Sequence, residues 1–211
     1  MKTLFTSIFV LLFIWNTQAQ VFKAGLILGI SGSQVEGDGY SGYRKLGFIA
    51  GGFTNTSLSE KFSTQLEIYF INKGSQRNPN PDQGDVDAFN LNINYIDVPL
   101  VLRYHYKSFM FEGGLYGSVF LGYSMSDEFG ERDTGAYPFK PYDFGGFLGM
   151  NYSINDRLIF NLRSKNSLLP VRDFENFDQQ VGILNKLFNR GWYNLDLNFS
   201  IRYQFGTKKN G

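Results

Sequence analysis

Few side chains in this sequence could carry out catalysis. His105 is the only histidine, and the chain has no cysteine. A catalytic triad of serine, histidine and acid needs a histidine as its base, so only His105 could serve. Because His105 lies beside the short stretch YKSF, at the end of an alternating segment, we interpret it as a hydrogen-bonded structural residue. We therefore expect no catalytic residues and predict that the protein is not an enzyme.

The stretch DQGDVD gathers three acidic side chains, Asp82, Asp85 and Asp87. Carboxylates at close spacing can bind calcium, but a twelve-residue calcium loop also needs a glutamate at its last position and a defined spacing. Both features are missing here. We expect a solvated acidic loop, and we predict neither metal ligands nor cofactor-binding residues in the chain.

A larger set of charged residues forms no sequence motif, but all of them lie on the polar face of alternating stretches. Each is a polar residue in a stretch where every second residue is apolar, as in YNLDLNFSIRYQF at 193–205. Strict alternation is the pattern of a β-strand whose two faces meet different surroundings. A closed interior tolerates charged side chains only when acids and bases pair. We expect a polar network in the lumen of a barrel, formed by Glu67, Lys73, Asp97, Arg103, Glu112, Arg163, Asp196 and Arg202.

Eight stretches alternate in this way, and they are the elements that must position the polar network. The expected strands are 22–31, 45–54, 62–74, 91–106, 109–122, 143–153, 157–165 and 193–205. Short connections follow the second, fourth and sixth stretches, whereas long connections follow the others. In an up-and-down antiparallel barrel, this order places all the long loops at one end, as in outer-membrane barrels. The sequence therefore predicts an all-β fold, an eight-stranded antiparallel up-and-down transmembrane β-barrel.

The composition agrees with a barrel that faces lipid. The chain has 24 glycines, 22 phenylalanines and 13 tyrosines but only 6 prolines. The apolar faces carry almost no charge, as lipid requires, since a lysine or arginine at the bilayer midplane costs about 2–4 kcal/mol. We expect inward glycines to make room for Tyr69 and Tyr116. The alternative is a secreted or membrane ligand-binding barrel; the secreted, lipocalin-like form binds its ligand in an apolar cavity and keeps its apolar residues inside.

The first twenty residues have the features of a secretory signal. Lys2 precedes an apolar run of about a dozen residues, which is too short for a membrane helix, and Thr17 and Ala19 suit a cleavage site. We expect a signal peptide at 1–19 and an outer-membrane β-barrel domain at 20–211. The net charge is +1, with acids and bases interleaved, so we expect no nucleic acid partner.

Three segments of the chain resemble the PorT-like family of outer-membrane β-barrel proteins, common in Bacteroidota. They are KFSTQLEIYFINKGS (61–75), YIDVPLVLRY (95–104) and YDFGGFLGMNYSINDRLIFNLR (142–163). The matching positions are Glu67, Tyr69, Lys73, Gly74, Tyr95, Pro99, Gly145, Gly149 and Arg163. Ser164 departs from the family pattern, which has an aromatic residue there. The resemblance implies an outer-membrane location, and the founding member of the family is implicated in protein secretion by the type IX system.

The last long connection contains an amphipathic pattern. Asp173 can cap a helix at its start and Gly191 can end it. We expect a partner-docking loop helix whose apolar face is made of Phe174, Phe177, Val181, Leu184, Leu187 and Phe188. Such a face needs a cover, which could be a partner protein, the outer-leaflet lipid or the mouth of the barrel itself.

These features predict a non-enzymatic outer-membrane protein, an accessory or interaction subunit of an envelope complex for protein secretion or outer-membrane assembly. Its expected partners are outer-membrane lipid and other envelope proteins, and we expect no soluble small-molecule substrate. A stand-alone structural envelope protein is the alternative within this class. A pore is not favoured, because eight strands enclose only enough space for their own side chains.

Overall fold

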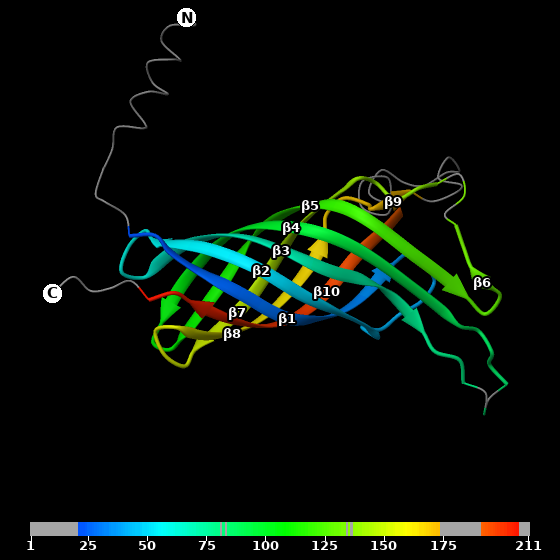
Figure 1. Cartoon of the computed structure of the whole chain (residues 1–211), viewed down its shortest axis with the longest axis horizontal. Coiled ribbons are helices and arrows are strands. Elements are labelled where there is room, and N and C mark those ends of the chain that lie inside the picture. Colours follow the sequence, from blue (N-terminus) through cyan, green and yellow to red (C-terminus); the bar gives the residue numbers. More distant parts are fainter. Residues whose placement is uncertain are drawn as a thin grey trace, which may run out of the picture.

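The computed structural model describes residues 21–80, 82, 84–133, 135, 137–173 and 191–206. Eight long strands form one antiparallel ring: β1 (Lys23–Glu36), β2 (Lys45–Ser57), β3 (Phe62–Arg77), β4 (Phe89–Tyr106), β5 (Phe109–Asp127), β7 (Tyr142–Ser153), β8 (Leu158–Ser167) and β10 (Gly191–Gln204). Each strand pairs with its neighbours in sequence order, and β1 pairs with β10 to close the ring (Figure 1). The predicted eight-stranded up-and-down barrel is confirmed.

Short and long connections lie at opposite ends of the ring. The short connections 58–61, 107–108 and 154–157 form what we call the short-turn end. The first and last described residues, Val21 and Gly206, lie at this end too (Figure 1). The longer connections, from β1 to β2, β3 to β4, β5 to β7 and β8 to β10, leave the strands at the opposite, long-loop end. This segregation is the one predicted from the connection lengths.

The strands extend further toward the long-loop end than the sequence pattern predicts. The predicted first, third and fifth strands end at 31, 74 and 122, whereas β1, β3 and β5 continue to Glu36, Arg77 and Asp127. Outward side chains become polar there, so the sequence looks like loop although the backbone pairing continues. Two short strands, β6 (Gly130–Glu131) and β9 (Arg172–Asp173), also lie within predicted loops. Among the described residues, no helix is long and apolar enough to cross a membrane.

An apolar belt surrounds the outside of the barrel. On β4, Val98, Leu100, Leu102, Tyr104 and Tyr106 are between 37% and 60% exposed. The outward apolar positions of this strand run from 96 to 106, which matches the roughly 9–11 residues that a tilted strand needs to cross a bilayer. The secreted, lipocalin-like alternative requires its apolar face inside, so the belt excludes it.

Aromatic side chains mark the edge of the belt at the short-turn end. Three pairs of rings lie there, with centroids 5.1 to 6.0 Å apart; two pairs join neighbouring strands and the third lies at the end of β10. The pairs are Phe62 with Tyr104, Phe109 with Tyr152, and Tyr203 with Phe205. Aromatic girdles of this kind lie at the water interfaces of transmembrane barrels. We therefore place one membrane boundary at these residues.

Beyond the other edge of the belt, the outward face of the strands becomes polar and the inward face becomes apolar. On β4, Asn90, Asn92 and Asn94 point outward, whereas Leu91 and Ile93 are fully buried. Polar side chains outside and apolar side chains inside are the arrangement of a barrel in water. The strands therefore continue past the lipid belt as a short water-exposed barrel at the long-loop end.

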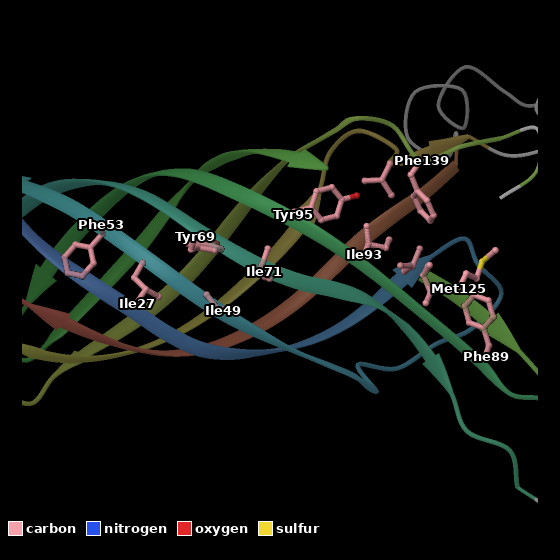
Figure 2. Close-up of a cluster of buried hydrophobic side chains, with 13 residues drawn as sticks. Ile27, Ile49, Phe53, Tyr69, Ile71, Phe89, Ile93, Tyr95, Met125 and Phe139 are labelled. Atoms are coloured by element: carbon pink, nitrogen blue, oxygen red, sulfur yellow. The ribbon is translucent and has the colours of Figure 1, made fainter. Parts of the chain in front are cut away.

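A β-bulge produces the same exchange on β5. The register between β4 and β5 shifts at Asn94 and Tyr95, where Leu121 is the extra residue on β5. Before the bulge the even-numbered Phe120 points inward, and after it the odd-numbered Met125 does. Met125 belongs to an apolar cluster, and Phe120 packs against it; the cluster runs along the inside of β1 to β3 and widens toward the long-loop end (Figure 2). We call this cluster the apolar plug; its buried members are Ile27, Val35, Ile49, Phe53, Tyr69, Ile71, Phe89, Leu91, Ile93, Tyr95, Met125, Phe139 and Val171.

Inward glycines make room for large side chains in the narrow ring. A Cβ atom at Gly145 would lie 2.4 Å from the hydroxyl oxygen of Tyr116. A Cβ atom at Gly51 would lie 2.4 Å from the Cβ atom of Tyr69. Both tyrosines are buried. The space that these glycines leave is therefore what allows the two tyrosines to point into the lumen.

Candidate functional site

Charged side chains inside the barrel form two clusters. The first, which we call the arginine cluster, contains Arg103, Arg163, Arg202, Glu67 and Glu112. Arg163 lies 2.8 Å from Glu67 and 2.7 Å from Glu112. Arg202 lies 3.1 Å from Glu67, and Arg103 lies 3.0 Å from Glu112. All five side chains are buried, so each carboxylate is held by several guanidinium groups away from water.

The second group, which we call the lysine cluster, lies closer to the long-loop end. Lys73 lies 3.5, 3.3 and 3.4 Å from Asp97, Asp143 and Asp196, and Lys165 forms an ion pair with Asp97. All five are fully or almost fully buried. The Lys165 ammonium also lies 4.1 Å from the centroid of the Tyr116 ring, a cation–π contact.

The two clusters balance each other in charge. Together they contain five carboxylates and five cationic side chains. The arginine cluster has one cation in excess, and the lysine cluster has one carboxylate in excess. Amide side chains add hydrogen bonds, such as those that Asn151 and Asn161 donate to Glu112 at 2.8 and 2.9 Å. A balanced, hydrogen-bonded set is the arrangement in which buried charges are tolerated.

The eight residues expected in the lumen all lie in these two clusters. The structure adds Lys165 and Asp143 to them. Lys165 was missed because the predicted strand stops at this residue, whereas β8 continues to Ser167. The signal was present, since Lys165 occupies the same face of the strand as Asn161 and Arg163.

Little empty space remains at the level of the clusters. A void bordered by Arg163, Arg202 and Tyr69 measures about 10 Å³, which is room for one water molecule at most. Between the lysine cluster and the long-loop end, Phe139 packs against Phe120 and Trp192. The centroid of the Phe139 ring lies 6.0 Å from the ring centroid of each of these two residues. In the part of the chain that the structure describes, side chains therefore fill the lumen from the arginine cluster to the long-loop end.

His105 forms a hydrogen bond with Ser63, with 2.7 Å between Nε2 and Oγ. Charged groups that act on the imidazole are Arg103 and Lys23, both cations. Among the described residues, no carboxylate bonds to His105. A serine hydroxyl beside a histidine therefore occurs here without the acid that would orient the histidine as a base.

The acidic loop is held by an arginine. Arg77 lies 2.8 Å from Asp85 and 3.3 Å from Asp87. The hydrogen bond from Arg77 lowers the pKa of Asp85. No group of three acidic or histidine side chains in the described ranges is arranged to hold a metal ion.

Two expectations concern residues outside the described ranges. The signal peptide was predicted at 1–19, which precedes the first described residue, Val21. The docking helix was predicted from Phe174, Phe177, Val181, Leu184, Leu187 and Phe188, which all lie in the undescribed segment 174–190. Both remain predictions.

Comparisons with known proteins agree with the barrel geometry. Residues 18–172 match the family described as outer membrane protein beta-barrel domain. No curated protein matches the chain with significance. One similar solved structure is that of Ail, the attachment invasion locus protein of Yersinia pestis, in complex with the heparin analogue sucrose octasulfate. It aligns with a TM-score of 0.51 and 10% sequence identity, and the alignment covers 87% of this chain and 99% of the Ail chain. Neisserial surface protein A aligns with a TM-score of 0.53 and 9% identity, over 86% and 97%. Identities this low establish a shared fold alone.

Proposed function

The chain belongs to the family of outer membrane protein beta-barrel domains and lies in the bacterial outer membrane, and from this premise we propose that it is a non-enzymatic interaction subunit of an envelope complex. Outer-membrane lipid surrounds the belt, and other envelope proteins bind at the ends of the barrel. We also propose that the protein is a PorT-like member of the family, that its complex serves protein secretion or outer-membrane assembly, and that residues 1–19 are a cleaved signal peptide.

One observation carries this proposal: side chains fill the lumen between the arginine cluster and the long-loop end. Transport through a barrel needs a continuous aqueous path, and eight strands leave little room for one. The paired charges at the membrane level and the apolar plug, which lies beside them and extends to the long-loop end, support a barrel that does not conduct. Hydrolysis is not favoured either, because His105 lacks a carboxylate partner among the described residues. The surfaces that remain for function are the two ends.

The long-loop end offers exposed side chains for an outer partner. Phe129, at the turn between β5 and β6, is 90% exposed, and Val86, between β3 and β4, is 67% exposed. Large apolar side chains in water are commonly covered by a partner. The amphipathic pattern at 174–188 lies in the sequence between β9 and β10, and we propose that it helps to dock the same partner.

Site-specific crosslinking in intact cells tests the proposal. A photo-reactive amino acid placed at Phe129 or Val86 should capture the same envelope protein, identified by mass spectrometry. The matched control is the same amino acid at Leu148, which is 74% exposed on the lipid belt and should capture no protein. A double variant, Phe177→Asp with Leu184→Asp, should reduce co-purification of the captured protein in mild detergent.

The outcomes separate the alternatives. Capture of one protein at both Phe129 and Val86, together with reduced co-purification of that protein in the double variant, supports an interaction subunit and a docking role for the loop. If neither position captures a protein and the barrel purifies alone, the interaction proposal is wrong and the stand-alone structural alternative replaces it.

A further inference from the structure

An open cavity occupies the short-turn end of the barrel, which is the periplasmic end in outer-membrane barrels. Its volume is about 740 Å³, within the roughly 300–1,000 Å³ typical of ligand sites. Arg103, from the arginine cluster, and Met110 contribute to its lining. The strands enclose the cavity and their apolar belt faces the other way. Bilayer lipid therefore contacts the outside of this wall, and the cavity is open to the periplasm.

The lining of the cavity is strongly cationic. Lys23, Arg103, Lys107 and Arg157 all line it, and Asp156 is its only carboxylate among the described residues. Within the described part of the chain, none of the salt bridges involves Lys23, Lys107 or Arg157. These three cations contrast with the arginine and lysine clusters, where every acid and base takes part in a salt bridge. An uncompensated positive cavity attracts anions from the surrounding solution.

The three unpaired cations come from three separate places around the ring. Lys23 is the first residue of β1, Lys107 lies in the turn between β4 and β5, and Arg157 lies in the turn between β7 and β8. Cations spread around a mouth suit a ligand whose negative charges are also spread out, whereas a single phosphate is best held by converging donors.

Neutral polar groups complete the wall. Asn55, Ser57 and Gln204 line the cavity with amide and hydroxyl groups, which can bond to peptide N–H and C=O groups. A wall of this kind matches an extended polypeptide that carries several carboxylates.

We propose that the periplasmic mouth of the barrel binds an extended acidic segment of a periplasmic protein, through Lys23, Lys107 and Arg157. The proposal deepens the proposed function, because it assigns a second docking site and states the charge of the partner that the site takes. The cavity lies at the opposite end of the barrel from the crosslinking sites Phe129 and Val86, so the two proposed docking sites can be tested separately.

A binding assay with the purified full-length barrel tests the site. The probe is hexaglutamate carrying a neutral dye, and fluorescence anisotropy measures its binding in zwitterionic detergent at low salt. We expect saturable binding that weakens as salt screens the charges. The triple variant Lys23→Gln, Lys107→Gln, Arg157→Gln should bind at least about tenfold more weakly, because it loses three attractive charges.

The matched control removes three positive charges at the other end. Arg44→Gln, Arg132→Gln, Lys140→Gln should bind hexaglutamate as the unmodified barrel does. Heat-modifiable migration on a gel confirms that both triple variants are folded barrels.

Three results would overturn the proposal. They are absence of hexaglutamate binding, an equal loss of affinity in both triple variants, and displacement of the peptide by inorganic phosphate at constant ionic strength, which would reveal a site for small oxyanions. None of these affects capture of a partner at Phe129 or Val86. Conversely, peptide binding together with failed capture would keep the cavity site and remove the interaction role of the outer end.

Discussion

Arg163 contacts both carboxylates of the arginine cluster and is almost fully buried. Replacing it by methionine keeps much of the volume but leaves Glu67 and Glu112 with fewer cations. We predict that Arg163→Met lowers the free energy of unfolding by about 3–5 kcal/mol, the usual cost of breaking a buried ion pair. Urea unfolding of the barrel in lipid vesicles measures this.

The control for this variant is an ion pair in water. Arg132 lies 3.1 Å from Asp127 and is well exposed. Arg132→Met should therefore change the free energy of unfolding by no more than about 1 kcal/mol. If the two methionine variants lose the same stability, the internal network does not stabilise the barrel in the way described.

Two glycines in the same barrel offer a matched test of inner space. A Cβ atom at Gly145 meets the Tyr116 side chain and the Asn166 carbonyl oxygen, whereas one at Gly117 meets nothing within 4 Å. Gly145→Ala should destabilise the barrel by about 1–3 kcal/mol through overpacking. Gly117→Ala should be neutral or slightly stabilising, since glycine is unfavourable inside a strand. The same urea experiment distinguishes them, and equal effects would contradict the proposed fit of Tyr116 over Gly145.

At the scale of the strand, β4 contains the boundary between lipid and water. Leu100 and Asn92 both point outward on it, within the belt and beyond it. Leu100→Arg should cost about 2–4 kcal/mol, and Asn92→Arg about 0–1 kcal/mol, because the cost of a charge depends on its depth in the bilayer. Refolding into vesicles measures both values. A large penalty at Asn92 would place that part of β4 inside the membrane.

The period of two predicted which segments form strands, but it could not predict where strands end. Lipid makes the outward positions apolar, so the alternation is clear only where a strand crosses the membrane. Beyond the bilayer, Gln34, Glu36 and Gln76 lie in segments predicted as loops, although the backbone there remains paired. The bulge at Leu121 also changes which residues of β5 point inward, from even-numbered to odd-numbered positions, and the alternation pattern did not predict it.

The candidate site was predictable to the same extent. Charged residues on the polar face, such as Glu67 and Arg163, follow directly from strand parity. The grouping into two clusters depends on which strands meet across the lumen, and parity cannot supply this. The cationic cavity was harder still, because Lys107 and Arg157 lie in turns, outside any alternating pattern.

At the scale of the whole molecule, the barrel has three levels. A cationic cavity opens at the periplasmic mouth, balanced charges share the membrane level with the part of the apolar plug that lines β1 to β3, and the rest of the plug fills the level nearer the long-loop end. Each level uses the side chains that its surroundings permit, and together they leave the ends as the surfaces available to partners. The central claim of this account is therefore that the barrel acts through its ends and does not conduct.

Electrical recording across a planar lipid bilayer tests that claim most directly. The purified, folded barrel is inserted in the bilayer, and a general porin in a parallel bilayer provides the reference signal. We predict that the barrel gives no conductance steps above the noise of the empty bilayer. Stable, reproducible steps from the folded barrel would show a continuous aqueous path through the clusters and would contradict the account.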